Sequence, residues 1–176
     1  MKGNKVNIKD LCDFLMMYFH KNEITINHLK LQKILYYIQS WHLVYFDRNP
    51  LFDDMPEAWV NGPVYRQIYD NLKPLGVYND IKHQKTNFTD IDEEFVKQRD
   101  KLGLEKEQLE FLDAIFKHYG TMSHEKLVFM THSELPWNDA RKALGVFDYS
   151  SNSIKHEIMY DYYKSKVDSK KNKNEL

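Results

Sequence analysis

The sequence predicts a mainly α fold, a compact single domain of about six to seven helices with a minor β-hairpin near residues 51–60. Three observations predict it. The 176 residues suit one domain, which should bury about two thirds of its unfolded surface. Apolar side chains recur every three or four residues through most of the chain, as on one face of an α-helix. This spacing is lost at residues 51–60, between two segments rich in turn-forming Asn, Gly and Pro.

Composition limits the classes of protein to which the chain can belong. The 25 Lys and Arg residues oppose 26 Asp and Glu residues, a formal charge of -1, so neither a strongly basic protein nor a nucleic-acid partner is expected. The single cysteine, Cys12, excludes an intramolecular disulfide framework and favours a reducing compartment, so we expect a cytoplasmic location. No apolar run approaches the roughly 18 residues that a membrane span needs.

Two amphipathic helices are expected at the N-terminus. In the first, over residues 8–19, apolar side chains share one face and charged side chains the other. The second has its inner face over residues 31–45, and either Thr25 or Asn27 is the expected N-cap. It ends before Pro50, because proline disfavours helical geometry in the residue that precedes it.

The middle of the chain contains the expected hairpin and one further helix. Residues 51–52 and 57–60 are predicted to be short extended pieces that flank a turn. Proline is favoured in the first turn of a helix, so the segment at 61–63 is interpreted as a helix start, followed by a buried face of Val64, Ile68 and Leu72. Residues 77–103 follow no clear period, and a local charge of -4 between residues 90 and 110, from eight acidic and four basic residues, predicts that this region faces water.

Four helices are expected in the second half. The first spans residues 105–120, Ser123 caps the second, and Pro136 opens a third that extends to Leu144. Residues 151–153 are the expected cap of the last helix, with Ile154, Ile158 and Tyr162 facing the core. Residues 164–176 are lysine-rich with little apolar surface, so the predicted domain comprises residues 1–163 and the predicted disordered tail residues 164–176.

A search for catalytic motifs finds none that is complete. The zinc-binding spacing that starts at His124-Glu125 has Val128 where a second histidine is needed. Ser133 beside His132 lacks the glycine-flanked turn of a nucleophile, and Cys12 lies on an apolar helix face, where a buried hydrophobic residue is the default. We therefore expect no enzyme activity, no cofactor and no metal. A hydrolase that uses His132, Glu134 or Glu125 is the weakest alternative.

Two segments combine a tryptophan with a turn and a proline, residues 57–64 and residues 131–137. The favoured interpretation is a structural corner in which each indole fills the core. The alternative is a rigid surface notch with a polar rim, a form that binding sites take on loops held by helices. Under that alternative the candidate partner-binding residues are Trp59, Asn61, Gly62, Pro63, Tyr65, His132, Glu134 and Trp137.

The same segments carry a family resemblance. In order along the chain, residues 31–37, 41–42, 50–53, 57–59, 62–64, 131–132, 136–137 and 154–163 resemble the motifs of the Panacea domain family, which includes SocA-like antitoxins and phage-associated GepA-like proteins. The resemblance covers nearly all of residues 5–163. Residues 78–103 match no fixed pattern, so partner-specific variation is expected there.

The resemblance implies an antitoxin of a toxin–antitoxin system. Members of the family are encoded beside small toxins and neutralise them by direct protein contact. A SocA-like member instead acts as an adaptor that delivers its toxin to a ClpXP-type protease, and this is the alternative. An uncharacterised phage-associated enzyme is the weaker third possibility. The resemblance supplies no catalytic residue, and no helix-turn-helix with a basic recognition face is recognised in the sequence.

Overall fold

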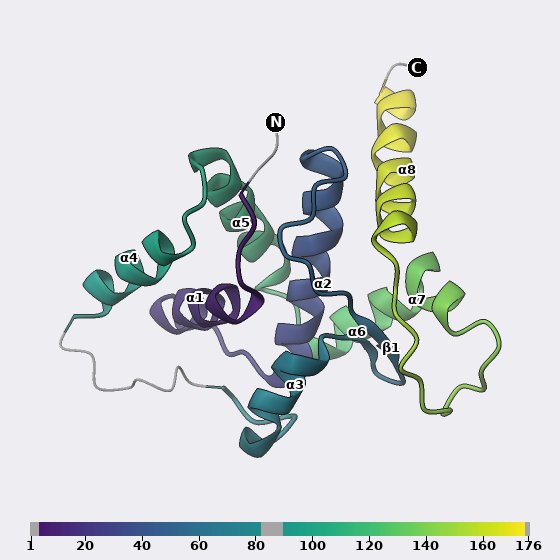
Figure 1. The fold of residues 1–176 in the computed structure, drawn as a ribbon, viewed down its shortest axis with the longest axis horizontal. Helices are drawn as coiled ribbons and strands as arrows, with labels where there is room; N and C mark the ends of the chain where they lie inside the picture. Colours follow the sequence, from purple (N-terminus) through teal and green to yellow (C-terminus); the bar gives the residue numbers. More distant parts are fainter. Residues whose placement is uncertain (1–3, 82–89, 175–176) are drawn as a thin grey trace.

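The computed structural model of the chain describes residues 4–81 and 90–174, and it confirms the mainly helical fold (Figure 1). Within these residues, eight α-helices, one short 3-10 helix and one antiparallel hairpin surround a single hydrophobic core. None of the described helices has the length and hydropathy needed to cross a membrane. The elements are α1 (Ile8–Lys21), α2 (His28–Tyr45), β1 (Glu57–Trp59), β2 (Gly62–Val64), α3 (Arg66–Leu72), the 3-10 helix η1 (Lys73–Leu75), α4 (Ile91–Lys101), α5 (Lys106–Tyr119), α6 (His124–His132), α7 (Leu135–Ala140) and α8 (His156–Asn174).

Helix α2 forms the centre of the fold (Figure 1). Helices α5, α6 and α8 and strand β2 pack around it. Its N-cap is Asn27, whose side chain accepts a hydrogen bond from the N–H of Lys30 at 2.9 Å, and this decides between the two predicted caps. Every residue from 28 to 40 is buried. A helix that is enclosed on all sides buries its polar face as well, so the polar side chains of α2 must find partners inside the protein.

Three buried glutamines, Gln32 and Gln39 on α2 and Gln108 on α5, find such partners in the backbone of other segments. Gln32 accepts a hydrogen bond from the N–H of Tyr65 at 2.8 Å and donates to the carbonyl of the same residue at 3.3 Å. Gln39 bonds residues 51 and 52 in the same way, and Gln108 bonds Asn4. Because a backbone N–H can donate only to the amide oxygen, these contacts fix which end of each side chain is the nitrogen.

Each of these amide nitrogens also contacts a histidine. The Nε2 atoms of Gln32, Gln39 and Gln108 lie 3.2, 3.0 and 3.0 Å from the Nε2 atoms of His28, His156 and His42. An amide nitrogen only donates, so each imidazole nitrogen must accept and is therefore unprotonated. Burial is the main cause that lowers the pKa of His28 and of His42 to about 4.

The hairpin lies later in the chain than predicted. Strands β1 and β2 pair with Trp59 opposite Gly62 and Ala58 opposite Pro63, and residues 51–52 belong to no strand. The segment at 61–63 is therefore part of the hairpin, not a helix start, and α3 begins at Arg66. Proline is compatible with a strand at the edge of a sheet, which is why the same residues satisfied either interpretation. The predicted buried face of Val64, Ile68 and Leu72 is confirmed.

Helix α4 lies in the region that had no readable period. Asp90 caps it by accepting hydrogen bonds from the N–H groups of Asp92 and Glu93. Its packing relies on few apolar contacts, among them that of the Phe95 ring with the Phe14 ring at 5.3 Å. Most of the helix is exposed, so its residues are largely polar and show no apolar period. For this reason the sequence did not predict the helix.

The C-terminal region differs from the prediction in two respects. Helix α7 ends at Ala140, before the predicted Leu144, and α8 begins only at His156. Of the three side chains predicted to face the core, Ile154 is buried, although it lies before the helix, and Tyr162 is half-buried against the core. The fully buried side chains of α8 are Met159 and Tyr163. Because Ile154 is not part of α8, it does not fix the buried face of the helix, which lies about 100° from the predicted positions.

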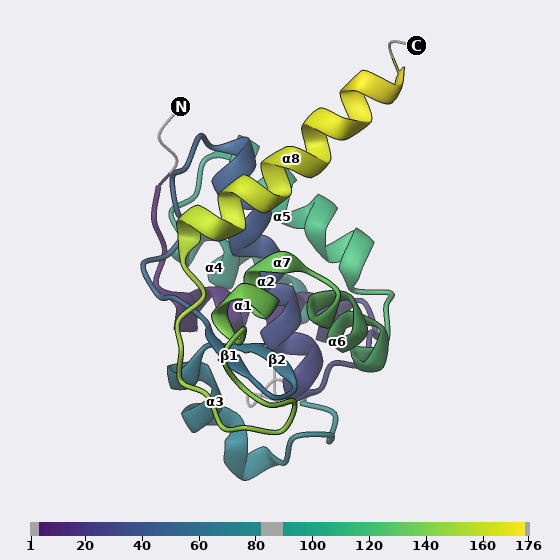
Figure 2. The ribbon, with the colours of Figure 1, turned by 90° about the vertical axis from the view of Figure 1, so that its right-hand side faces the viewer.

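The predicted disordered tail is also corrected. Residues 164–174 continue α8, and the C-terminal half of this helix extends past the body of the domain (Figure 2). Lys166 contributes to its attachment, because its ammonium donates to the carboxylate of Glu134 at 3.1 Å and lies over the ring of Tyr162. Residues 175–176 lie outside the described part of the chain.

Candidate functional site

The two segments singled out in the sequence meet in the structure. The indole N–H of Trp137, on α7, donates to the backbone carbonyl of Trp59, on β1, at 2.9 Å. The guanidinium of Arg141 donates to the neighbouring carbonyl of Ala58 at 2.8 Å. The hairpin is therefore held to α7 by side-chain donors.

The hairpin also lies close against α2 and α6, because residue 62 has no side chain. Gly62 has φ of +94°, in the left-handed region. A Cβ at this position would lie 2.5 Å from Cε of Lys33 and 2.8 Å from Oγ1 of Thr131, and both of those residues are buried. Glycine is thus required both by the backbone conformation and by the close approach.

A buried lysine supports the hairpin from α2. The ammonium of Lys33 has no exposed surface and donates to the carbonyl of Pro63 at 3.0 Å. Burial lowers the pKa of Lys33 to about 7, since a charged amine loses its hydration there. The ring of His132 stacks on the indole of Trp137 at 4.2 Å, and burial, followed by the charge of Lys33, lowers the pKa of His132.

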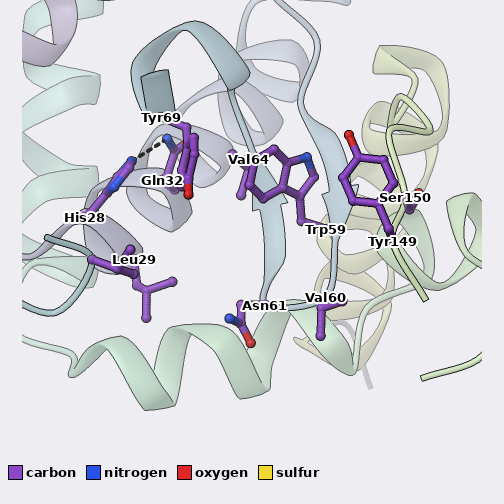
Figure 3. A pocket seen from close by; sticks show the side chains of 11 residues that line it. His28, Leu29, Gln32, Trp59, Val60, Asn61, Val64, Tyr69, Tyr149 and Ser150 are labelled. Carbon is purple, nitrogen blue, oxygen red and sulfur yellow. Dashed lines mark hydrogen bonds between the residues drawn. The ribbon is translucent and has the colours of Figure 1, made fainter. Parts of the chain in front are cut away.

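A mostly apolar pocket of about 190 Å³ opens beside the hairpin. The indole of Trp59 lies between Val64 and Tyr69 on one side and Tyr149 on the other, and Asn61 lies at the rim (Figure 3). The ring centres of Trp59 and Tyr69 are 4.7 Å apart. The remaining lining residues are His28, Leu29, Gln32, Val60, Val77 and Ser150.

Beside the pocket, the loop of residues 145–149 carries exposed apolar side chains. Val146 is 74%, Phe147 86% and Tyr149 71% exposed. The loop is nevertheless held in place, because Nη2 of the buried Arg141 donates to three of its carbonyls at 2.9–3.3 Å. We call the surface formed by Trp59, Asn61, Tyr69, Val146, Phe147 and Tyr149 the hairpin face.

Replacement of Arg141 by lysine is expected to loosen this loop. A single ammonium cannot reach the carbonyl of Ala58 and three loop carbonyls at once, as the forked guanidinium does. The free energy of unfolding should fall by about 2 kcal/mol, and the amides of residues 145–149 should exchange faster in deuterium-exchange mass spectrometry. The exposed neighbour Lys142, replaced by arginine, is the control and should change neither measurement. Unchanged exchange in Arg141→Lys would contradict the assignment.

Exposure divides the eight candidate residues. Asn61 is exposed, and Trp59, His132 and Trp137 are half-buried. The four others are buried, so they support the surface from inside rather than form it; these are Gly62, Pro63, Tyr65 and Glu134.

Glu134 illustrates this supporting position. Burial raises the pKa of its carboxyl, while one oxygen accepts a hydrogen bond from the hydroxyl of Tyr163 at 2.5 Å and the other accepts one from Lys166 at 3.1 Å. Since both partners lie on α8, Glu134 joins the start of α7 to that helix.

A metal centre needs several side chains that can share one metal ion. Across residues 4–81 and 90–174, no three His, Cys, Asp or Glu side chains come together as possible metal ligands. Cys12 is buried in α1, and burial raises the pKa of its thiol. This fits the interpretation of Cys12 as a small buried hydrophobic residue.

The sequence analysis missed several residues of the hairpin face, namely Tyr69, Val146, Phe147 and Tyr149. The last three gave one signal, because they are apolar residues that follow Gly145 outside any helical period. Apolar side chains in a loop have no helix face to pack on, and they indicate either a buried loop or a contact surface. Tyr69 gave no such signal, since it belongs to α3.

A comparison with known protein families gives a match. Residues 31–138 match the family described as Antitoxin SocA-like, Panacea domain. Neither the curated proteins nor the solved structures contain a match. The matched range covers more than half of the chain and contains α2 from Leu31 onward, the hairpin and the joint between α6 and α7. The chain therefore belongs to the SocA-like antitoxin family that carries the Panacea domain.

Proposed function

We propose that the protein is an antitoxin that neutralises a partner toxin by direct contact through the hairpin face. The observation that carries this proposal is the exposed but fixed apolar surface of that face. Phe147 and Val146 are exposed on a loop that Arg141 holds in place, and Tyr149 of the same loop lines the pocket around Trp59. Membership of an antitoxin family supports a protein as the partner.

Exposed apolar surface is unfavourable for the free protein in water. A partner that covers this surface stabilises the complex by roughly 25 cal/mol for each Å² of apolar area removed from water. Several exposed apolar side chains on one short loop are typical of interaction sites. Because the guanidinium of Arg141 already orders the loop, binding would lose little further backbone entropy.

We also propose a structural role, rather than a catalytic one, for His132 and Glu134, which a hydrolase would need. The imidazole of His132 is stacked on Trp137, and both carboxylate oxygens of Glu134 are bonded to α8. Their observed contacts therefore support a structural role for both.

The test uses the product of the reading frame next to this gene, expressed alone and with the protein. We expect it to arrest growth alone and to be neutralised by the wild-type protein. Phe147→Asp should weaken binding of the purified toxin at least thirtyfold, which corresponds to about 2 kcal/mol, without lowering the midpoint of urea unfolding. Phe129, which is 68% exposed on α6, provides the matched control. Phe129→Asp should retain wild-type affinity.

Two outcomes would contradict the proposal. The neighbouring product could be harmless when expressed alone, so that there is no toxin to neutralise. Alternatively, Phe147→Asp and Phe129→Asp could weaken binding equally, which would remove the hairpin face from the interface.

A second candidate function, delivery of the toxin to a ClpXP-type protease, is favoured by one observation. The C-terminal half of α8 extends past the body of the domain, where a second protein could reach it (Figure 2). The truncation that tests this must keep Lys166, because its bond to Glu134 attaches the helix. We expect deletion of residues 171–176 to spare toxin binding in vitro and to lengthen the half-life of the toxin in cells. An unchanged half-life would argue against delivery through this segment.

A further inference from the structure

A second concave surface lies away from the hairpin, between α5 and α8. Two adjoining hollows of about 460 and 600 Å³ share Trp41, Tyr45, His118, Tyr119 and Lys170. Helix α2 supplies the floor, α5 one wall and α8 the other. We call this trough, defined by those five residues, the aromatic groove. None of its residues belongs to the hairpin face.

The floor of the aromatic groove is aromatic and fixed. The indole N–H of Trp41 donates to the hydroxyl of Tyr119 at 2.7 Å. The ring of Tyr119 is stacked in turn on the buried ring of Tyr37, with ring centres 4.2 Å apart and planes 9° apart. Tyr45 is 67% exposed at the groove, although it belongs to the most enclosed helix of the fold. Rigid aromatic side chains with exposed faces are typical anchors of protein interfaces.

The charge of the groove indicates what could fill it. In α8, Lys164 pairs with Asp168 and Lys166 with Glu134. Lys170 lines both hollows and forms no ion pair with any residue that the structure describes. An apolar floor beside an unpaired ammonium suits an occupant with an apolar face and a carboxylate at its edge.

We infer that the aromatic groove binds an amphipathic helix of the partner toxin, with its apolar face on Trp41 and Tyr45 and a flanking carboxylate at Lys170. This inference rests on the proposed function. Helices frame the groove on three sides, so a fourth helix completes the packing of side chains between them. Glu107 on the α5 wall repels any anion near it, so the carboxylate of the occupant is assigned to the α8 side, at Lys170. A single-stranded nucleic acid fits less well, because its repeated phosphates would also approach Glu107 and because Lys166 is already paired.

The first test maps the contact in the purified complex of the full-length protein with the toxin product of the neighbouring reading frame. Tyr45 is replaced by the photo-crosslinking residue p-benzoylphenylalanine, and the same residue is placed at position 129 on α6 as a control. Irradiation should crosslink position 45, not position 129, to one toxin segment. Mass spectrometry should identify that segment as helical, apolar on one face and acidic at its edge.

The second test uses two charge reversals that change the net charge equally. Lys170 lines the groove, whereas the adjacent Lys171 lines neither hollow. Lys170→Glu should weaken toxin binding about tenfold, an effect that shrinks at high salt. Lys171→Glu should leave the affinity within twofold of wild type. Reversal of the crosslinked carboxylate to lysine in the toxin should restore binding to Lys170→Glu.

The outcomes separate this inference from the proposed function. If the complex forms and depends on Phe147 but position 45 gives no crosslink, the inference is overturned and the hairpin face stands. A crosslink to nucleic acid, to a basic segment or to a non-helical segment overturns it as well, as do equal effects of the two lysine reversals. If no complex forms with the wild-type protein, both proposals fail.

Discussion

Alanine at position 62 is expected to destabilise the protein by about 3 kcal/mol. A left-handed conformation costs a non-glycine residue roughly 1–2 kcal/mol, and forcing extra volume into a packed interior costs a further 1–3 kcal/mol. Both penalties apply, because Gly62 has φ of +94° and its missing Cβ would lie 2.5 Å from Lys33. Lys33 is fully buried and cannot move aside into solvent. Urea unfolding followed by circular dichroism measures the loss.

Gly103 provides the matched control for this substitution. It also has positive φ, +59°, but a Cβ there would meet no atom within 4 Å. Gly103→Ala should therefore cost only the backbone penalty, about 1 kcal/mol. In a double-mutant cycle, Lys33→Ala should relieve part of the penalty of Gly62→Ala, because the two side chains occupy the same space. Equal losses at the two glycines would show that the hairpin does not lie close against α2.

Mild acid is expected to destabilise the protein by about 4 kcal/mol between pH 7.5 and pH 5. The pKa values of His28 and His42 are lowered to about 4, whereas the ordinary value in an unfolded chain is about 6.5. The unfolded state therefore binds more protons in this range. Stability from these groups is complete above pH 6.5 and is lost as the pH falls towards 4. The pKa of His156 is also lowered, which acts in the same direction.

The geometry explains why these histidines resist protonation. The Nδ1 atom of His42 lies 2.8 Å from the carbonyl of Asn49, and its Nε2 accepts from the amide of Gln108. A proton on Nε2 would face the amide hydrogens. We expect His42→Gln to remove about 2 kcal/mol of the change between pH 7.5 and pH 5, measured as the free energy of unfolding at each pH. An unchanged pH dependence in this variant would contradict the neutral state of His42.

Lys33 extends this dependence to alkaline pH. Its pKa is lowered to about 7 by burial, against about 10.4 in an unfolded chain, so the unfolded state again binds more protons between the two values. Stability should therefore rise from pH 7 to pH 9, by about 2 kcal/mol. The rise should disappear in Lys33→Met, which keeps a long side chain without an ionisable group. A wild-type stability that does not rise from pH 7 to pH 9, or a rise that persists in Lys33→Met, would contradict the lowered pKa of Lys33.

The parts of the fold that the sequence predicted well are those with a strong apolar period. Residues 8–19, 31–45 and 105–120 each have one, and α1, α2 and α5 were expected close to their observed bounds. Ser123 was predicted as a cap, and its hydroxyl accepts from the N–H of Lys126. Local periodicity and caps involve only neighbours in the chain, so they can be interpreted without the fold.

The errors have different physical causes. The 61–63 segment satisfies the local rules for a helix start, but residues 62–64 pair with residues 57–59 across a tight turn and form a strand. Residues 164–174 have too little apolar surface to predict a helix, yet Lys166 pairs with Glu134 on a distant part of the chain. This second contact cannot be inferred from residues near it in sequence.

Only part of the candidate site was predicted from the sequence. Tryptophan, proline and glycine marked the two segments of the joint, and these residue types carried the family resemblance that the match confirms. The resemblance did not show which residues are exposed on the surface and which support it from inside. Tyr65 and Glu134 are buried, whereas Phe147 and Tyr149 are exposed, and the sequence analysis named the first pair and missed the second.

The sequence by itself determined a single helical domain, the family to which it belongs and the two segments that meet at its joint. Only the tertiary structure decided which of their side chains reach the surface. Exposure depends on what covers each residue, and here the cover comes from distant elements: α7 carries the guanidinium that holds residues 145–149, and α8 encloses Glu134. A local pattern can specify the face that a side chain occupies, but not the neighbour that buries it.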